Sequence, residues 1–310
     1  MRVLSLTMTL LLLLTAPALV ARSRAQEPTS VDKTGTLEGF LKANEPDKGT
    51  VTLTLPTPFG EKTLTVADPA AKERLAKAQK DDIVKFVVAD ATNPTRLTKL
   101  QEIRRPVAKL SRFIAMALSL ALVCGLAATM VGGSPLAFLI GVDNRYSNSQ
   151  TQLALWFAAL ATAYLATVAL RFLCLGADYI GGVGITENLL ALTGLSALSF
   201  GGAKVITTQK IENATQPNQP APKPPAAQPH LLTDLVQNDH QHADLGDFQM
   251  ILITLGAVGV FVVTTFHFLG ELQLAAQVTL PDVDTTLLAS FGIGQGAYLT
   301  KKAALKLGDG

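Results

Sequence analysis

Hydrophobic and polar residues are distributed differently along the two parts of the chain. Up to about residue 105, short stretches alternate between apolar and polar side chains, whereas most of the remainder consists of long apolar runs with almost no charge. Alternation at every second residue predicts strands with one buried face. Apolar runs of about 20 residues are typical of helices that cross a bilayer. The sequence therefore predicts a multi-domain protein, with a small β-rich domain followed by an α-helical membrane domain.

The β-rich domain is expected over residues 26–108. Its strands are predicted, in chain order, at residues 34–40, 50–55, 62–66, 83–88 and 96–100. Asp68 followed by Pro69 forms an N-cap with a proline in the first turn, which predicts a short helix over residues 70–79. Five strands with one helix before the last two resemble the topology of small OB-like β-barrels.

The composition of this domain restricts its ligands. Residues 26–109 contain no Met, His, Cys or Trp, so the soft ligands that copper prefers are missing. Binding of single-stranded nucleic acid favours exposed aromatic residues, but Phe40 and Phe86 lie in predicted strands, where packing in the core is the simpler expectation. The net charge of +2 is small, and no basic stripe is present. We expect no nucleic-acid partner.

The amino terminus predicts export. Residues 1–25 have the features of a signal peptide, with Arg2, an apolar run over residues 3–20 and the small residues Ser23 and Ala25 before Gln26. An uncleaved anchor helix is the alternative, because the apolar run is long and basic residues follow it. Both interpretations place the β-rich domain outside the cytoplasm.

The apolar runs predict about five membrane spans, at residues 113–131, 153–172, 189–206, 250–268 and 286–300. The first lies in a lone segment over residues 109–133. The third and fifth are near or below the usual minimum length, so we expect them to be short or tilted. A stretch rich in Pro, Gln and Ala predicts a flexible cytoplasmic linker over residues 207–231.

Residues 134–206 and residues 232–310, which end in a basic tail, match each other. Three polar positions recur in the same order, Asp143, Ser147 and Gln152 in the first part and Asp239, Asp244 and Gln249 in the second. A Leu-Leu-Ala sequence, a glycine and a lysine follow at matching distances in both. The pattern indicates an internal duplication of a helical hairpin, with chance similarity of two apolar hairpins as the alternative. Two spans in each part predict parallel repeats.

Basic residues predict the orientation in the membrane. With the β-rich domain outside, the loops that carry Arg145, Lys204 and Lys210 and the basic tail all face the cytoplasm, as the positive-inside rule requires. A cluster just before the first span opposes this trend: Arg104, Arg105, Lys109 and Arg112. We expect a multi-pass protein of a bacterial inner membrane, with its amino-terminal domain extracytoplasmic.

Small and polar residues gather on the third and fifth predicted spans, and they are expected either to pack helices or to line a pore: Thr193, Ser196, Ser199, Gly292, Gln295, Gly296 and Tyr298. Gly292 and Gly296 form a GxxxG pair, which favours close helix packing. Gln295 is the best polar candidate within the membrane, and an interhelical hydrogen bond is its simplest use.

Several kinds of chemistry lack support. No predicted span has an ionisable residue at its centre, which argues against an ion-coupled transporter, and Arg171 and His267 lie near span ends. The segment from Asp239 to Asp244 contains two histidines, but its aspartates are assigned to a loop and a helix cap. No Ser-His-Asp, HExxH or P-loop pattern occurs. We expect no enzyme activity, cofactor or metal.

The paired Asp, cap and Gln segments and the Leu-Leu-Ala helices give residues 136–302 a resemblance to multi-pass bacterial membrane proteins that have no assigned function. The resemblance implies neither a substrate nor catalytic residues. The sequence therefore favours a non-enzymatic membrane scaffold or sensor that presents the exported β-domain to a partner, either another protein or a second copy of the chain. An oligomeric channel lined by the short helices is the alternative.

Overall fold

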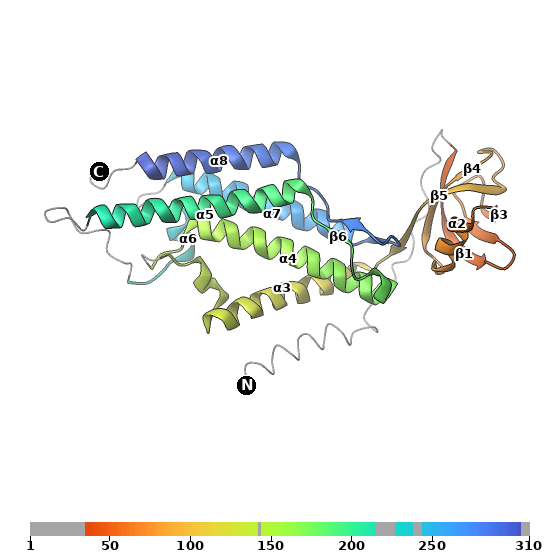
Figure 1. Cartoon of the computed structure of the whole chain (residues 1–310), viewed down its shortest axis with the longest axis horizontal. Helices are drawn as coiled ribbons and strands as arrows, with labels where there is room; N and C mark the ends of the chain where they lie inside the picture. The colour runs from red at the N-terminus through yellow and green to blue at the C-terminus, as the bar shows by residue number, and fades with distance from the viewer. Residues whose placement is uncertain (1–34, 142–143, 215–226, 238–243, 305–310) are drawn as a thin grey trace.

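The structure is a computed structural model of the 310-residue chain, and it describes residues 35–141, 144–214, 227–237 and 244–304. A β-domain lies at one end of the molecule, and long helices extend away from it side by side (Figure 1). The signal-peptide prediction, Asp143, Asp239 and residues 215–226 of the expected linker lie outside the described residues.

The alternating sequence forms the strands of one sheet, namely β1 (Thr36–Glu45), β2 (Thr50–Thr54), β3 (Glu61–Val66), β4 (Ile83–Val88) and β5 (Arg96–Pro106). Strand β1 pairs antiparallel with β2 and β4, β2 pairs with β3, and β4 pairs with β5. Strand β3 also pairs in parallel with β5, so each of the five strands pairs with two others of this set.

Helix α2 (Pro69–Ala76) lies between β3 and β4, and the Asp68 carboxylate caps it by accepting a hydrogen bond from the Ala70 N–H at 3.1 Å. Phe86 is fully buried, as expected. Phe40 is only half-buried, so its placement in the core was wrong. The residues of β1 that face the core are Leu37, Gly39 and Leu41, so Phe40 points to the other face of the strand. Gly39 has no space for a side chain, because a Cβ there would lie 2.6 Å from Leu55 Cδ2.

One strand of this sheet comes from far along the chain. Strand β7 (Glu271–Gln273) pairs antiparallel with the end of β5, with Arg105 opposite Leu272. The sequence predicted that the last strand would end near residue 100, but β5 continues to Pro106 because β7 gives its final residues a partner. The sheet therefore includes residues that lie between two helices of the membrane domain.

The long helices are α3 (Lys109–Val131), α4 (Asn148–Leu175), α5 (Glu187–Ala214), α7 (Leu245–Phe268) and α8 (Thr285–Ala304). Among the described residues, four helical segments are long and apolar enough to cross a membrane, namely Lys109–Val131, Asn148–Leu175, Glu187–Ile206 and Leu245–Phe268. The fifth predicted span forms most of α8, which is not among these four. Helix α5 also continues to Ala214, so the first part of the expected linker is helical.

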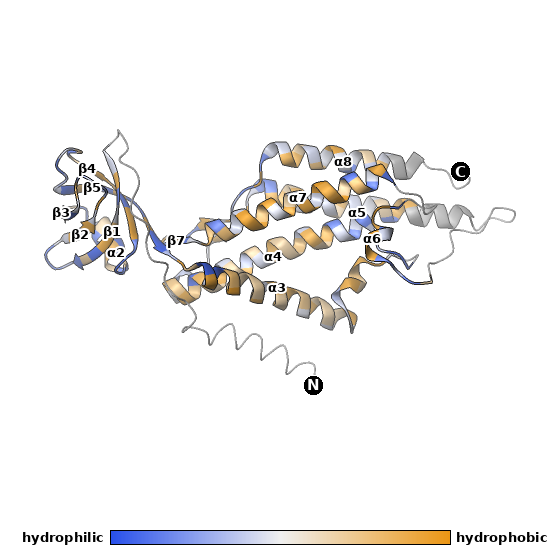
Figure 2. Ribbon diagram, turned by 180° about the vertical axis from the view of Figure 1, so that it is seen from behind, coloured by the Kyte–Doolittle hydropathy of each residue, from blue (hydrophilic) through white to orange (hydrophobic). Residues whose placement is uncertain are grey.

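Hydrophobic residues predominate along the long helices (Figure 2), and many of them are exposed. Large side chains such as Phe113, Met130, Leu198 and Ile293 are 65%, 80%, 70% and 75% exposed. Exposed apolar surface on this scale would be costly in water and is suited to lipid. Helix α3 has 23 residues, so it is about 35 Å long and exceeds the roughly 30 Å hydrocarbon core of a bilayer. The chain is therefore a membrane protein with a β-sheet domain.

Candidate functional site at the junction of the β-domain and the helices

Two of the three hydroxyl groups predicted on α5 form hydrogen bonds within that helix. Thr193 Oγ1 donates to the Leu189 carbonyl at 2.8 Å, and Ser196 Oγ donates to the Leu192 carbonyl at 2.9 Å. Ser196 and Ser199 are buried, whereas Thr193 is half-buried. Short side chains of this kind allow the backbones of neighbouring helices to approach closely.

Gln295 connects three helices through a partner on α4. Its Nε2 donates to Gln152 Oε1, and Gln152 Nε2 in turn donates to Thr254 Oγ1 on α7 at 3.0 Å. Gln152 and Gln295 are 0% and 3% exposed. Within the described part of the chain, Gln295 Oε1 has no hydrogen-bond partner. The interhelical hydrogen bond expected for Gln295 is present, and its partner is the glutamine that the sequence singled out only for its place in the repeat.

The remaining predicted positions, on α7 and α8, differ in burial and in their neighbours. Gln249, which corresponds to Gln152 in the repeat, is exposed. Gly292 lies near Leu195 of α5, since a Cβ there would be 3.8 Å from Leu195 Cδ1, whereas a Cβ at Gly296 would have nothing within 4 Å. The GxxxG pair therefore does not form one packing face in the described chain, and Tyr298 is half-buried.

The expected caps of α4 and α7 also differ. Asp244 accepts hydrogen bonds from the N–H groups of Gly246 and Asp247, at 2.8 and 3.3 Å. Ser147 occupies the N-cap position of α4 without a side-chain capping bond. The main chains nevertheless match: the Ser147 N–H donates to the Leu139 carbonyl, and the Asp244 N–H donates to the Val236 carbonyl, both at 2.8 Å.

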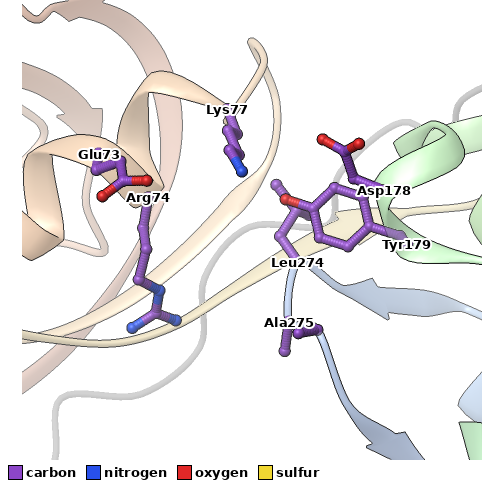
Figure 3. Close-up of a pocket in the computed structure, with 8 residues that line it drawn as sticks. Glu73, Arg74, Lys77, Asp178, Tyr179, Leu274 and Ala275 are labelled. Carbon is purple, nitrogen blue, oxygen red and sulfur yellow. The ribbon is translucent and has the colours of Figure 1, made fainter. Parts of the chain in front are cut away.

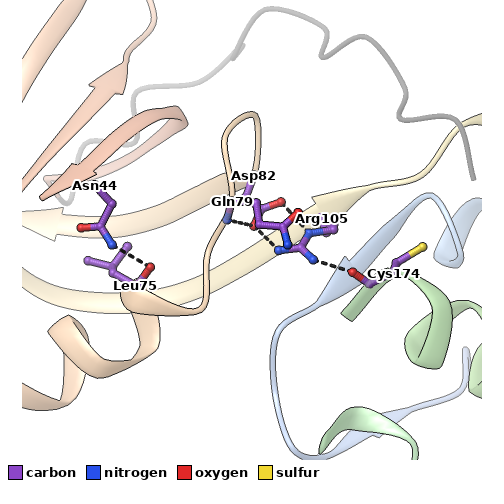
Figure 4. Close-up of polar contacts among 6 residues, drawn as sticks. All are labelled: Asn44, Leu75, Gln79, Asp82, Arg105 and Cys174. Atoms are coloured by element: carbon purple, nitrogen blue, oxygen red, sulfur yellow. Dashed lines mark hydrogen bonds and ion pairs between the residues drawn. The ribbon is translucent and has the colours of Figure 1, made fainter. Parts of the chain in front are cut away.

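The junction between the β-domain and the helices is built around Arg105. Its guanidinium pairs with both carboxylate oxygens of Asp82, with Nε–Oδ1 at 2.9 Å and Nη2–Oδ2 at 2.8 Å (Figure 4). Its Nη1 donates to the carbonyl of Cys174, near the end of α4. The Gln79 N–H also donates to Asp82 Oδ2, at 2.7 Å. Because both charges are buried, each depends on the other for compensation.

Arg104, on the other face of β5, is paired with carboxylates from three segments. It lies 2.9 Å from Glu38 on β1 and 3.6 Å from Glu102 on β5, and it also pairs with Glu271 on β7. The Glu271 contact connects β5 to the segment that follows α7. Arg104 thus strengthens the pairing of β5 with β7, whereas the side chain of Arg105 joins β5 to Asp82 and to the end of α4.

Arg112, in the first turn of α3, fixes that helix to the end of α7. Its Nε donates to the Val107 carbonyl at 3.0 Å, and its guanidinium carbon lies 5.2 Å from the centre of the Phe266 ring. A Cβ at Gly270 would lie 2.7 Å from Arg112 Nη1, so this position has no space for a side chain. The carbonyl oxygens at a helix C-terminus favour a nearby cation.

Arg171, near the end of α4, joins the loops of the two hairpins. It donates from Nε to the Tyr179 carbonyl at 2.8 Å and from Nη2 to the Ala275 carbonyl at 2.8 Å. A further bond reaches the Gln273 carbonyl at 3.3 Å. Arg171 is 1% exposed, so it does not extend toward the membrane surface as a snorkelling residue would.

A second connection between the loops lies beside this arginine. Strand β6 (Val183–Gly184) of the first hairpin pairs in parallel with β8 (Val278–Thr279) of the second. Asp282 accepts hydrogen bonds from Thr186 Oγ1 at 2.6 Å and from Asn188 Nδ2 at 2.9 Å. The two loops therefore form one connected layer next to the β-domain.

A cleft of about 350 Å³ opens where this layer faces α2 of the β-domain. Glu73 and Arg74 on α2 and Lys77, directly after it, line one wall, and Asp178 and Tyr179, from the 3-10 helix η3 (Ala177–Tyr179), line the other. Lys77 faces Asp178 and Tyr179 across the cleft (Figure 3). Leu274, Ala275 and Ala276 form its apolar base. This site could not be predicted from the sequence, because its walls come from three distant segments.

Neither protein-family models nor characterised proteins nor solved structures give a match to this chain. The fold and the junction define a helical membrane protein that carries a β-sheet domain on one end of its helices. Its function is therefore argued from the geometry of that junction.

Proposed function

We propose that the chain is a non-enzymatic membrane scaffold or sensor, in which an exported domain with OB-like topology is held firmly on a helical bundle. The OB-like assignment is supported by the ring of pairings from β1 to β5 and by the position of α2 between β3 and β4. Domains of this topology bind extended ligands on their strands and loops, which suits a role in binding a partner.

The observation that carries this proposal is the contribution of β7 to the β-domain sheet. Strand β7 belongs to the loop of the second hairpin, and the Arg105 bond to the Cys174 carbonyl reaches the end of α4 in the first. A partner that moved the β-domain would therefore displace both hairpins. Packed elements connected in this way can transmit a change at one site to another.

The internal duplication belongs to the same proposal. A one-turn helix precedes each hairpin, η2 (Pro135–Leu139) before α4 and α6 (Leu231–Asp234) before α7. The matching N–H bonds of Ser147 and Asp244 and the parallel pairing of β6 with β8 support parallel repeats.

We infer that the β-domain lies outside the cytoplasm of a bacterium and that the helices cross its inner membrane. The cluster that opposed this orientation has structural roles, since Arg104 and Arg105 pair with carboxylates and Arg112 bonds to main-chain carbonyls. The basic residues of the other loops and of the tail all support this orientation.

An oligomeric channel has less support. Thr193 and Ser196 bond to carbonyls of their own helix, and the Gln295 amide bonds to Gln152. A permeation path requires polar groups that face a continuous aqueous route. Ion flux through proteoliposomes that changed with Gln295→Leu would favour the channel over the scaffold.

Hydrogen exchange on the full chain in lipid nanodiscs tests the scaffold or sensor role. Arg105→Gln is expected to increase exchange at Glu271–Gln273 and in the loop after α4, because the end of β5, with which β7 pairs, loses its side-chain bonds to Asp82 and to the Cys174 carbonyl. Lys99→Gln, at an exposed position of β5, should leave both segments unchanged. Faster exchange confined to the β-domain would contradict the proposed coupling.

Cysteine labelling tests the orientation. Lys99→Cys on the β-domain should react with a membrane-impermeant maleimide on intact cells, whereas Ser134→Cys, in the turn after α3, should react only after permeabilisation. The reverse pattern would overturn the orientation.

A further inference from the structure

The cleft between α2 and the hairpin loops combines charges of both signs with an apolar base. Arg74 and Lys77 supply two cationic groups, and Glu73 and Asp178 supply two carboxylates. Arg74 also donates to the Gln101 carbonyl at 3.3 Å, which holds its guanidinium beside β5. A volume of about 350 Å³ is at the small end for ligand sites and suits a compact polar molecule.

The position of the cleft places it at the height of lipid headgroups. Asp178 and Tyr179 follow directly after α4, whose apolar segment ends at Leu175. Ala275 and Ala276 lie in the loop after α7, another apolar helix that ends at the same side of the bundle. Polar headgroups occupy the several ångströms beyond the hydrocarbon core. Ile180, which is 41% exposed, offers apolar surface beside the cleft for an acyl chain.

We propose that this cleft binds a zwitterion that carries a phosphate and a primary ammonium group, as in the headgroup of phosphatidylethanolamine. Lys77 binds the phosphate, with Arg74 as a second cation on the same wall, and Asp178, which Lys77 faces across the cleft, accepts hydrogen bonds from the ammonium. An ammonium has three N–H donors, and charge-assisted bonds of this kind are strong and directional. The Tyr179 ring and Leu274 exclude water from one side of the ligand.

Other headgroups fit this arrangement less well. An anionic headgroup such as phosphatidylglycerol leaves the Asp178 carboxylate without a cation and adds repulsion. A choline headgroup has no N–H donor, so it cannot form hydrogen bonds with Asp178. The site therefore discriminates through the ammonium as well as through the phosphate. This inference is independent of the scaffold or sensor role, because it concerns a ligand and not the transmission of movement.

Native mass spectrometry of the full-length protein in detergent tests the proposal with four probes: short-chain phosphatidylethanolamine, phosphatidylcholine and phosphatidylglycerol, and soluble O-phosphoethanolamine. We expect phosphatidylethanolamine to bind about tenfold more tightly than the other two lipids, because each charge-assisted bond that is lost costs roughly this factor. Binding of O-phosphoethanolamine as tight as that of the lipid would support the same site with a soluble zwitterion as its ligand.

Variants then locate the site. Lys77→Gln and Asp178→Asn are each expected to weaken phosphatidylethanolamine binding by about tenfold. Lys99→Gln, which removes an exposed lysine outside the cleft, should leave it unchanged. Thermal unfolding of each variant checks that the fold is retained. Equal binding of the three lipids, tightest binding of phosphatidylglycerol, or wild-type binding by folded Lys77→Gln would overturn the proposal.

Discussion

Arg105 and Asp82 form a two-bond ion pair at 2.9 and 2.8 Å, at the point where the last strand of the β-domain approaches the helices. Both residues are almost inaccessible, at 3% and 1% exposure. The third guanidinium nitrogen, Nη1, donates to the Cys174 carbonyl, so one side chain joins the β-domain to the first hairpin.

Replacing Asp82 with Asn should destabilise the protein by about 3–5 kcal/mol, because Arg105 would remain buried without a compensating charge. The free energy of unfolding of the full chain in detergent measures this effect. The exposed pair of Lys42 and Glu61 provides the control, and Lys42→Ala should cost less than about 1 kcal/mol. Equal losses in the two variants would show that the Arg105 pair is not buried.

The Gln152 and Gln295 pair should be energetically coupled within the membrane domain. We expect Gln152→Leu and Gln295→Leu to show a coupling energy of about 0.6–1.7 kcal/mol in a double-mutant cycle, the range found for hydrogen bonds between membrane helices. Unfolding in mixed micelles supplies the measurement. Gln249→Leu is the matched control, since Gln249 has the equivalent place in the repeat but is exposed. Zero coupling would contradict the observed contact.

Replacing Gly182, which precedes the strand β6 that pairs with β8, should lower the stability of the protein. Its φ is +73°, and a Cβ there would lie 2.1 Å from the Ala276 carbonyl oxygen. Gly182→Ala adds backbone strain of about 1–3 kcal/mol to that clash, so we expect a lower midpoint of thermal unfolding. Gly181→Ala should have little effect, because a Cβ at Gly181 has nothing within 4 Å. Similar midpoints for both variants would contradict this loop geometry.

The cap of α8 should make stability depend on pH in the acid range. Hydrogen bonds from the Thr286 side chain and then its N–H lower the pKa of Asp284 below its usual value of 3.8. The ionised carboxylate therefore stabilises the folded state fully above about pH 4, and this contribution is lost as pH falls through the lowered pKa. Wild type should exceed Asp284→Asn in stability at neutral pH, with a difference that decreases toward pH 2. A pH-independent difference would contradict this role.

Local patterns were sufficient to predict the strands. The segments that form β2 and β3 alternate between polar and apolar residues, the segment that forms β4 is rich in β-branched and aromatic residues, and Asp68 with Pro69 identified the start of α2. Phe40 was misplaced because its strand has a glycine at an inward position: Gly39 contributes no side chain to the apolar pattern, although it faces the core.

The junction could not be predicted, because its contacts join residues that are distant in sequence. Glu271–Gln273 is too short to be identified as a strand, and its partner β5 lies more than 160 residues earlier. Arg171 and the basic cluster before α3 appeared in the sequence only as charges near span ends, because most of their acceptors lie far away in the chain: loop carbonyls for Arg171, and carboxylates such as Glu38, Asp82 and Glu271 for Arg104 and Arg105. Burial at matching positions of the repeat could not be predicted either: Gln152 is buried and Gln249 is exposed, although the two residues occupy equivalent places in the sequence.

A distance measurement between the β-domain and the helices tests the central claim, that the two move together. Spin labels at Lys99→Cys and Leu198→Cys, with Cys124 and Cys174 replaced by Ser, should give one narrow distance distribution by pulsed electron resonance in nanodiscs. Adding Arg105→Gln and Leu272→Pro should broaden it, while a label pair within the bundle, at Leu198 and Val263, stays narrow. A broad distribution before these changes, or an unchanged one after them, would contradict the account.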